Sequence, residues 1–130
     1  MTTSNPVHRT TVPDPAEAAR STRTAWVMVP VWVATFVVTS YAGVVVLDWL
    51  GLGEGDLWLF ARNVWGWVAE IGFTLLVGAP AGVGIAYAVR ALRRGARASA
   101  GAALALDSVL LLLVLYMFAD AVRMTYWPGP

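Results

Sequence analysis

Apolar side chains fill three long stretches of this chain almost without interruption, and polar segments separate the stretches. The first covers residues 25–47, the second 66–89 and the third 100–122. A run of about 20 apolar residues is long enough to cross the hydrocarbon core of a bilayer as an α-helix, which rises about 1.5 Å per residue. The pattern therefore predicts an all-α integral membrane protein whose residues 25–130 form a domain of three transmembrane helices.

The segment before the first apolar stretch is polar and contains three prolines. Residues 1–24 offer too little apolar surface to offset the entropy of ordering the backbone, so we expect a disordered tail. Asp14 and Pro15 fit the cap and the first position of one short helical turn, but a solvated linker is the simpler interpretation. The apolar stretch that follows has some features of a signal peptide, yet its 23 residues favour an uncleaved membrane anchor.

A short amphipathic segment precedes the second apolar stretch. Asp56 is a suitable N-cap, and Leu57, Phe60 and Val64 recur at helical spacing while Arg62 lies on the opposite side. We expect a short helix lying in the membrane interface here.

The arginines indicate the orientation of the chain in the membrane. Four of the nine form a dense cluster between the second and third stretches: Arg90, Arg93, Arg94 and Arg97. By the positive-inside rule this connection is cytoplasmic. Residues 1–24, with three further arginines, are then also cytoplasmic, and the C-terminus is extracytoplasmic.

Composition excludes several classes of function. With 58% hydrophobic and 13% charged residues the chain is far from a soluble domain, in which about a quarter of residues are charged. There is no Cys, so cysteine nucleophiles and thiolate metal sites are excluded. The one His is His8, outside the apolar stretches, so the usual general base and the usual zinc or haem ligand are missing from the membrane part. We therefore expect no enzyme, no cofactor and no metal, and the net charge of +1 gives no reason to expect nucleic acid as a partner. The absence of Lys and the abundance of Ala, Val, Gly and Arg are typical of GC-rich bacterial genes, which predicts a bacterial cytoplasmic (inner) membrane protein.

Small residues at every fourth position predict where helices pack closely. The second stretch contains the row Gly78, Gly82 and Ala86, and the first stretch a similar row, Thr35, Thr39 and Gly43. Small residues four apart let two helices approach within a membrane. Packing of these two rows inside one molecule is the favoured interpretation, and self-association is the alternative.

Glu70 and Asp107 are the two acidic residues that need a structural or functional reason, because the other six lie outside the apolar stretches or, like Asp120, at an outer end. A charged side chain at the centre of the membrane costs about 2.5–3.5 kcal/mol on insertion scales. Because the second and third helices run antiparallel, the two carboxyls differ in depth by roughly 16 Å and cannot share an ion or a proton.

Each carboxyl has a structural explanation to weigh against a functional one. Glu70 is expected to join an interfacial group of charges made of Asp48, Arg62, Asp120 and Arg123. Asp107 is expected to be paired or protonated inside the bundle, with Tyr87 and Arg90 as conceivable partners. The functional alternative for both is a substrate, ion or partner site.

These patterns predict a small accessory or structural membrane protein that packs against partner helices, either of other membrane proteins or of a second copy. The alternative is a homo-oligomeric channel or ion-coupled carrier in which Glu70 and Asp107 line the pathway. A membrane enzyme ranks third, because no nucleophile or metal set accompanies the carboxyls. A holin-like, membrane-lysing protein ranks fourth, and cell lysis on mild overexpression would indicate it.

The three-span arrangement predicts that residue 96 and the C-terminus lie on opposite sides of the membrane. Reporter tags placed at these two points should give opposite responses in a topology assay, with the tag at residue 96 cytoplasmic. Both tags on one side would refute three spans.

Overall fold

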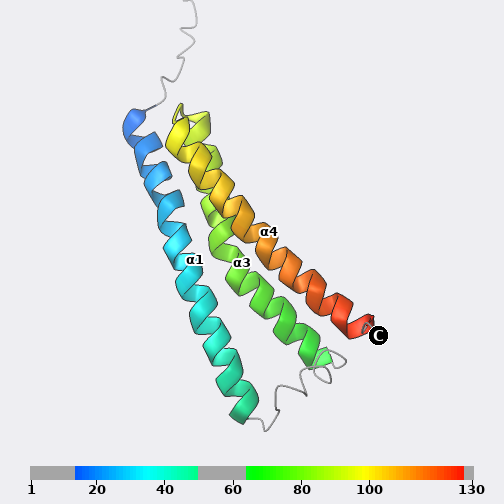
Figure 1. Ribbon diagram of the computed structural model, residues 1–130. Coiled ribbons are helices and arrows are strands. Elements are labelled where there is room, and N and C mark those ends of the chain that lie inside the picture. The colour runs from blue at the N-terminus through cyan, green and yellow to red at the C-terminus, as the bar shows by residue number, and fades with distance from the viewer. Residues whose placement is uncertain (1–13, 50–63, 128–130) are drawn as a thin grey trace, which may run out of the picture.

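The computed structural model describes residues 14–49 and 64–127, and this part of the chain is helical almost throughout (Figure 1). Helix α1 covers Pro15–Trp49, α3 covers Val64–Arg93 and α4 covers Ala98–Tyr126. Each is long and apolar enough to cross a membrane. The all-α class and the three apolar helices are thus confirmed, which indicates a multi-pass membrane protein.

The start of α1 differs from the sequence-based expectation. Residues 15–24, predicted as part of a disordered tail, form the first turns of α1 instead. The Asp14 carboxylate accepts a hydrogen bond from the Ala16 backbone N–H at 2.9 Å, and Pro15 occupies the first helical position, where its missing N–H is harmless. Residues 1–13 and most of the predicted interfacial helix lie outside the described residues, and α3 begins at Val64.

The first turns of α1 also have tertiary contacts that hold them in place. Glu17 Oε2 lies 2.8 Å from Arg94 Nη1, just beyond the end of α3, and Trp26 Nε1 donates a hydrogen bond to Ser99 Oγ of α4 at 2.9 Å. Exposed ion pairs contribute only about 0–1 kcal/mol, but here two polar contacts act together at one end of the bundle. They connect the start of α1 to the α3–α4 turn and to the start of α4.

A tight turn joins α3 to α4 and makes them antiparallel. The backbone N–H groups of Arg94 and Ala96 both donate to the Ala91 carbonyl at 3.1 Å, and Gly95 adopts a positive φ of 94°. Glycine adopts this conformation without a steric penalty, which lets the chain leave α3 and reverse. Figure 1 places this turn beside the first turns of α1.

Helix α3 is the centre of the bundle, since α1 and α4 each contact α3 more extensively than they contact one another. The residues on its most buried side recur at alternating spacings of four and three positions, and they are Val77, Ala81, Gly84, Ala88 and Ala91. This spacing keeps one side of a helix against its neighbours, and small residues allow a close approach.

Two buried clusters form on this side of α3. In the middle of the bundle, Val77 and Ala81 pack with Trp32 of α1 and Val114 of α4. Nearer the α3–α4 turn, Ala88 packs with Ala25 and Ala103. Each cluster thus contains residues of all three helices.

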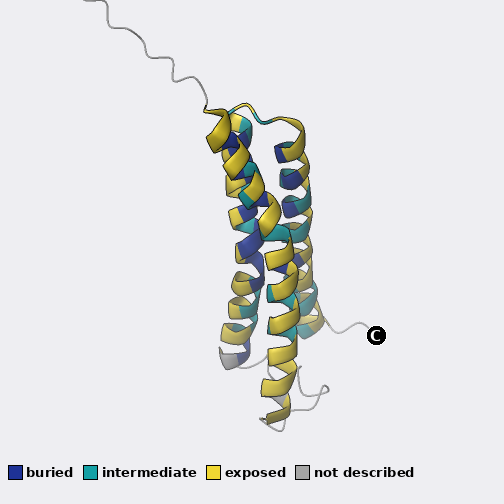
Figure 2. Ribbon diagram, turned by 90° about the vertical axis from the view of Figure 1, so that its left-hand side faces the viewer, coloured by how far each residue is buried: buried dark blue, intermediate teal, exposed yellow. Residues whose placement is uncertain are grey.

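Most large apolar side chains of the described residues lie on the outside of the bundle, as Figure 2 shows by the exposed colour that covers the outer faces. Val44, Leu75 and Leu112 are examples, one from each helix. Such continuous apolar exposure is not found on soluble monomers, and lipid tails or other membrane helices are the surroundings that suit it.

Replacing Ala88 by Leu should destabilise the bundle, because Ala88 is 0% exposed between α1 and α4 and a larger side chain forces the helices apart. We expect a loss of about 1–3 kcal/mol, measured by denaturation in detergent micelles. The matched control is Ala86→Leu on the exposed side of the same helix, which should leave stability almost unchanged. Equal effects of the two substitutions would contradict this packing.

Candidate functional site

The carboxyl groups of Glu70 and Asp107 occupy separate places in the bundle. Asp107 of α4 lies against Gly84 of α3, whereas Glu70 is fourteen residues before Gly84 on α3. At 1.5 Å per residue this amounts to about 21 Å along the helix. The structure therefore does not bring Glu70 and Asp107 together.

Asp107 is sealed inside the bundle. Its relative exposure is 0%, and within the described residues neither carboxyl oxygen has a hydrogen-bond partner. Tyr87 and Arg90, the conceivable partners, are exposed and do not reach it. A buried charge without a partner is strongly unfavourable in a membrane, so the placement of this carboxyl needs a structural or functional reason.

Gly84 makes room for this carboxyl. A Cβ atom at position 84 would overlap all three atoms of the Asp107 carboxyl group, whereas one at Gly82 would meet nothing within 4 Å. Sequence reasoning missed Gly84 because it followed the row of every fourth residue through Gly78 and Gly82. The alternate four and three spacing from Val77 through Gly84 is the signal that identifies it.

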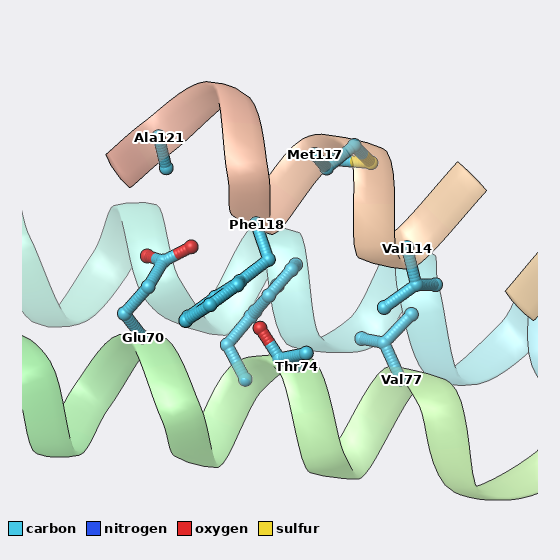
Figure 3. Close-up of a pocket in the computed structure, with 8 residues that line it drawn as sticks. Glu70, Thr74, Val77, Val114, Met117, Phe118 and Ala121 are labelled. Carbon is cyan, nitrogen blue, oxygen red and sulfur yellow. The ribbon is translucent and has the colours of Figure 1, made fainter. Parts of the chain in front are cut away.

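Glu70 belongs to a cavity between α3 and α4 with a volume of about 280 Å³ (Figure 3). Glu70 and Thr74, one turn apart on α3, supply its oxygen atoms. Figure 3 shows both side chains directed from α3 toward α4, with Ala121 opposite Glu70. The small side chain of Ala121 leaves the space beside the carboxylate open.

The rest of the cavity wall is apolar. Phe73 of α3 and Met117 and Phe118 of α4 form its sides, and Val77 and Val114 close the end nearer the core. Figure 3 shows Phe118 reaching from α4 toward α3 between Glu70 and Thr74. One carboxylate and one hydroxyl thus lie within an aromatic and aliphatic enclosure.

An aromatic cluster adjoins the cavity on the side away from the core. Trp67 of α3 meets Phe118 edge to face at 6.3 Å between ring centroids, and it stacks on Tyr126 at 6.1 Å. Offset and edge-to-face pairs of this kind hold aromatic rings in defined positions. Phe118 is therefore fixed both as a cavity wall and as a contact of Trp67.

The expected group of charges around Glu70 does not form within the described residues. Asp120 and Arg123 pair with one another at 3.4 Å, on the same helix. The other ion pair in this part of the chain, Glu17 with Arg94, lies at the opposite end of the bundle. Asp48 is exposed near the end of α1, and Arg62 lies outside the described residues. Residues 14–49 and 64–127 thus provide no cation for Glu70.

The two predicted packing rows lie partly inside and partly outside the contacts of the single chain. Gly78 is buried beside Leu111 and Val114 of α4, and Gly82 is half-buried with open space around it. Ala86 and Gly43 are exposed, and nothing lies within 4 Å of a Cβ built on Gly43. Thr35 and Thr39 are half-buried. The predicted row on α3 is therefore buried at Gly78 and leaves the buried side of the helix at Gly82 and Ala86.

No cluster of candidate metal ligands occurs among residues 14–49 and 64–127. Such a cluster would consist of three or more His, Cys, Asp or Glu side chains. Comparison with known proteins adds no function, because no family model, no curated protein and no solved structure matches the chain.

The contact between Gly84 and Asp107 predicts that Gly84→Ala destabilises the bundle by about 1–3 kcal/mol, since the new methyl group displaces a buried carboxyl. Gly82→Ala is the matched control and should be neutral or slightly stabilising, because its methyl group enters open space. Denaturation in detergent measures both. Combining Gly84→Ala with Asp107→Ala should restore most of the lost stability, and a double variant as unstable as Gly84→Ala alone would disprove the contact.

Proposed function

We propose that this protein is an accessory subunit of the bacterial cytoplasmic membrane, a small multi-pass protein whose helices pack against the helices of a partner. The proposal is supported by the apolar surface that the three helices leave uncovered. The partner is another membrane protein.

The single observation that carries this proposal is the lack of buried residues in the second half of α1. From Val33 to Val46 this helix has no buried residue, although Thr35, Thr39 and Ser40 are polar. A helix of a self-sufficient bundle is expected to bury one side along its whole length. The exposed side of α1 between Val33 and Val46 is therefore available to another helix.

Gly43 supports the use of this surface for packing with a partner. Its exposure and the open space around it leave the α1 backbone accessible, and Thr39 lies one turn away on the same side. Close helix–helix contacts in membranes favour small and hydroxyl-bearing residues at this spacing. A partner helix fits here without displacing α3 or α4.

The orientation that we propose follows from the arginines. Arg20 and Arg23 belong to the first turns of α1, next to the α3–α4 turn, which contains Arg94 and Arg97. Basic residues gathered at one end of a bundle favour the cytoplasmic side for that end. The C-terminal end of α4 is then extracytoplasmic.

A homo-oligomeric channel or carrier is the second candidate, and Asp107 is the observation that favours it, because a buried carboxyl without a partner is typical of functional sites in membranes. However, Asp107 is enclosed by its own chain, whereas a residue that lines a pathway between copies needs to face the partner copy. The accessory function agrees better with this enclosure.

Extraction in a mild detergent should recover a complex of this protein with a second membrane protein, and Gly43→Leu should lower the recovered partner at least about fivefold, because the added side chain blocks close approach of helices. Mass spectrometry with native gel analysis measures the partner and the size of the complex.

Gly72→Leu on α3 is the matched control, since Gly72 is also exposed with nothing within 4 Å, and partner recovery should remain as in the wild type. A wild-type protein that is extracted as a lone monomer would rule out the accessory function. Equal loss from both glycine variants would show that the partner does not bind at α1.

A further inference from the structure

The cavity between α3 and α4 combines features that the accessory function leaves unused. Glu70 supplies a carboxylate that the described residues leave without a cation, and Thr74 adds one hydroxyl. Phe73, Met117 and Phe118 supply most of the remaining wall. We propose that this cavity binds an organic cation, an ammonium group attached to an apolar body, with Glu70 as its counter-ion.

The cavity has too few side-chain oxygen atoms to fit a metal ion well. Calcium takes six to eight oxygen ligands and magnesium requires a nearly ideal octahedron. The cavity presents one carboxylate and one hydroxyl, from Glu70 and Thr74, and the described residues contain no cluster of three or more His, Cys, Asp or Glu side chains that could hold a metal ion. An organic ammonium needs fewer ligands, because contacts with its carbon atoms replace most of its hydration.

The aromatic walls favour a cation over a neutral ligand. An ammonium group within about 6 Å of an aromatic ring face is attracted by the negative charge density of that face, and the attraction grows when water is removed. Phe73 and Phe118 both line the cavity that contains Glu70, and Figure 3 shows Phe118 beside the carboxylate. Trp67 holds the Phe118 ring from outside the cavity, which keeps this wall in position.

The size and polarity of the cavity determine the kind of organic cation. A volume of about 280 Å³ is near the lower limit for small-molecule sites, so the ligand has one ring or a short branched chain. Val77 and Val114 close one end with aliphatic carbon, Glu70 lies toward the other end, and Thr74 lies between Glu70 and Val77 on α3. The ammonium group is therefore placed near Glu70 and the apolar body against the two valines.

Two sources offer this chemistry, namely a free organic cation in the aqueous phase and the amine headgroup of a membrane lipid. Both present an ammonium group attached to carbon, and Glu70 binds either in the same way. The probe for the test is benzyltrimethylammonium, because its charge is independent of pH and its ring suits the apolar end. Neopentylbenzene is the neutral molecule of the same shape.

Equilibrium dialysis of the full-length protein in uncharged maltoside micelles should show saturable binding of benzyltrimethylammonium, one molecule per chain. Glu70→Gln should weaken binding at least about tenfold, since it removes the counter-ion and keeps the side-chain shape. Phe118→Leu should weaken binding about threefold to tenfold, because it retains an apolar wall and removes the ring. Thermal unfolding shows which of these two variants remain folded. The affinity of either folded variant for the probe is enough to decide the test.

Glu17→Gln is the matched control, an identical change at an exposed carboxylate at the other end of the bundle, and it should leave the affinity unchanged. Adding phosphatidylethanolamine should displace the probe if a lipid headgroup is the natural occupant, and phosphatidylglycerol should not. Displacement by neither lipid assigns the site to a free cation. The proposal is overturned if the wild type shows no saturable binding, if Glu70→Gln binds as well as the wild type, or if neopentylbenzene displaces the charged probe equally well.

Discussion

Close contact of helices across the small residues of α3 is the interaction on which the other features of this bundle depend. Within a membrane no water is available to drive apolar side chains together, so association relies on dense packing and on polar contacts. Ala81, Gly84 and Ala88 allow α1 and α4 to approach α3 on one side. Farther along α3 the small residues give way to larger ones, with Phe73 and Trp67 facing α4. The cavity occurs at this change, because bulky rings fill the space between two helices less completely than methyl groups do.

The three spans could be predicted from the sequence because continuous apolar runs of this length have few other structures open to them. The start of α1 could not be predicted, although the sequence indicated Asp14 and Pro15 as the cap and first position of a helical turn. The first turns of α1 have contacts with distant parts of the chain, namely Glu17 with Arg94 and Trp26 with Ser99. Long-range contacts of this kind have no local signature in the sequence.

The candidate site was predictable only in part. The unfavourable placement of a carboxyl in apolar surroundings identifies Glu70 and Asp107 directly from the sequence. Their surroundings do not follow from it, because a uniformly apolar helix such as α4 gives no periodic signal for the side that faces the protein. Phe118 and Gly84 gain their importance from contacts across helices, with Trp67 and Asp107 respectively. Only the relative rotation of the helices reveals these pairs.

The enclosure of Asp107 also bears on how the chain enters a membrane. On its own, α4 would present this carboxyl to hydrocarbon in the third turn of the helix. The tight turn at Gly95 and the recess at Gly84 bring α3 against the carboxyl as soon as the two helices lie side by side. Insertion of α3 and α4 as a joined hairpin therefore avoids a state in which Asp107 is exposed to lipid. Gly84 on α3 thereby provides the space that keeps Asp107 of α4 away from lipid during membrane insertion.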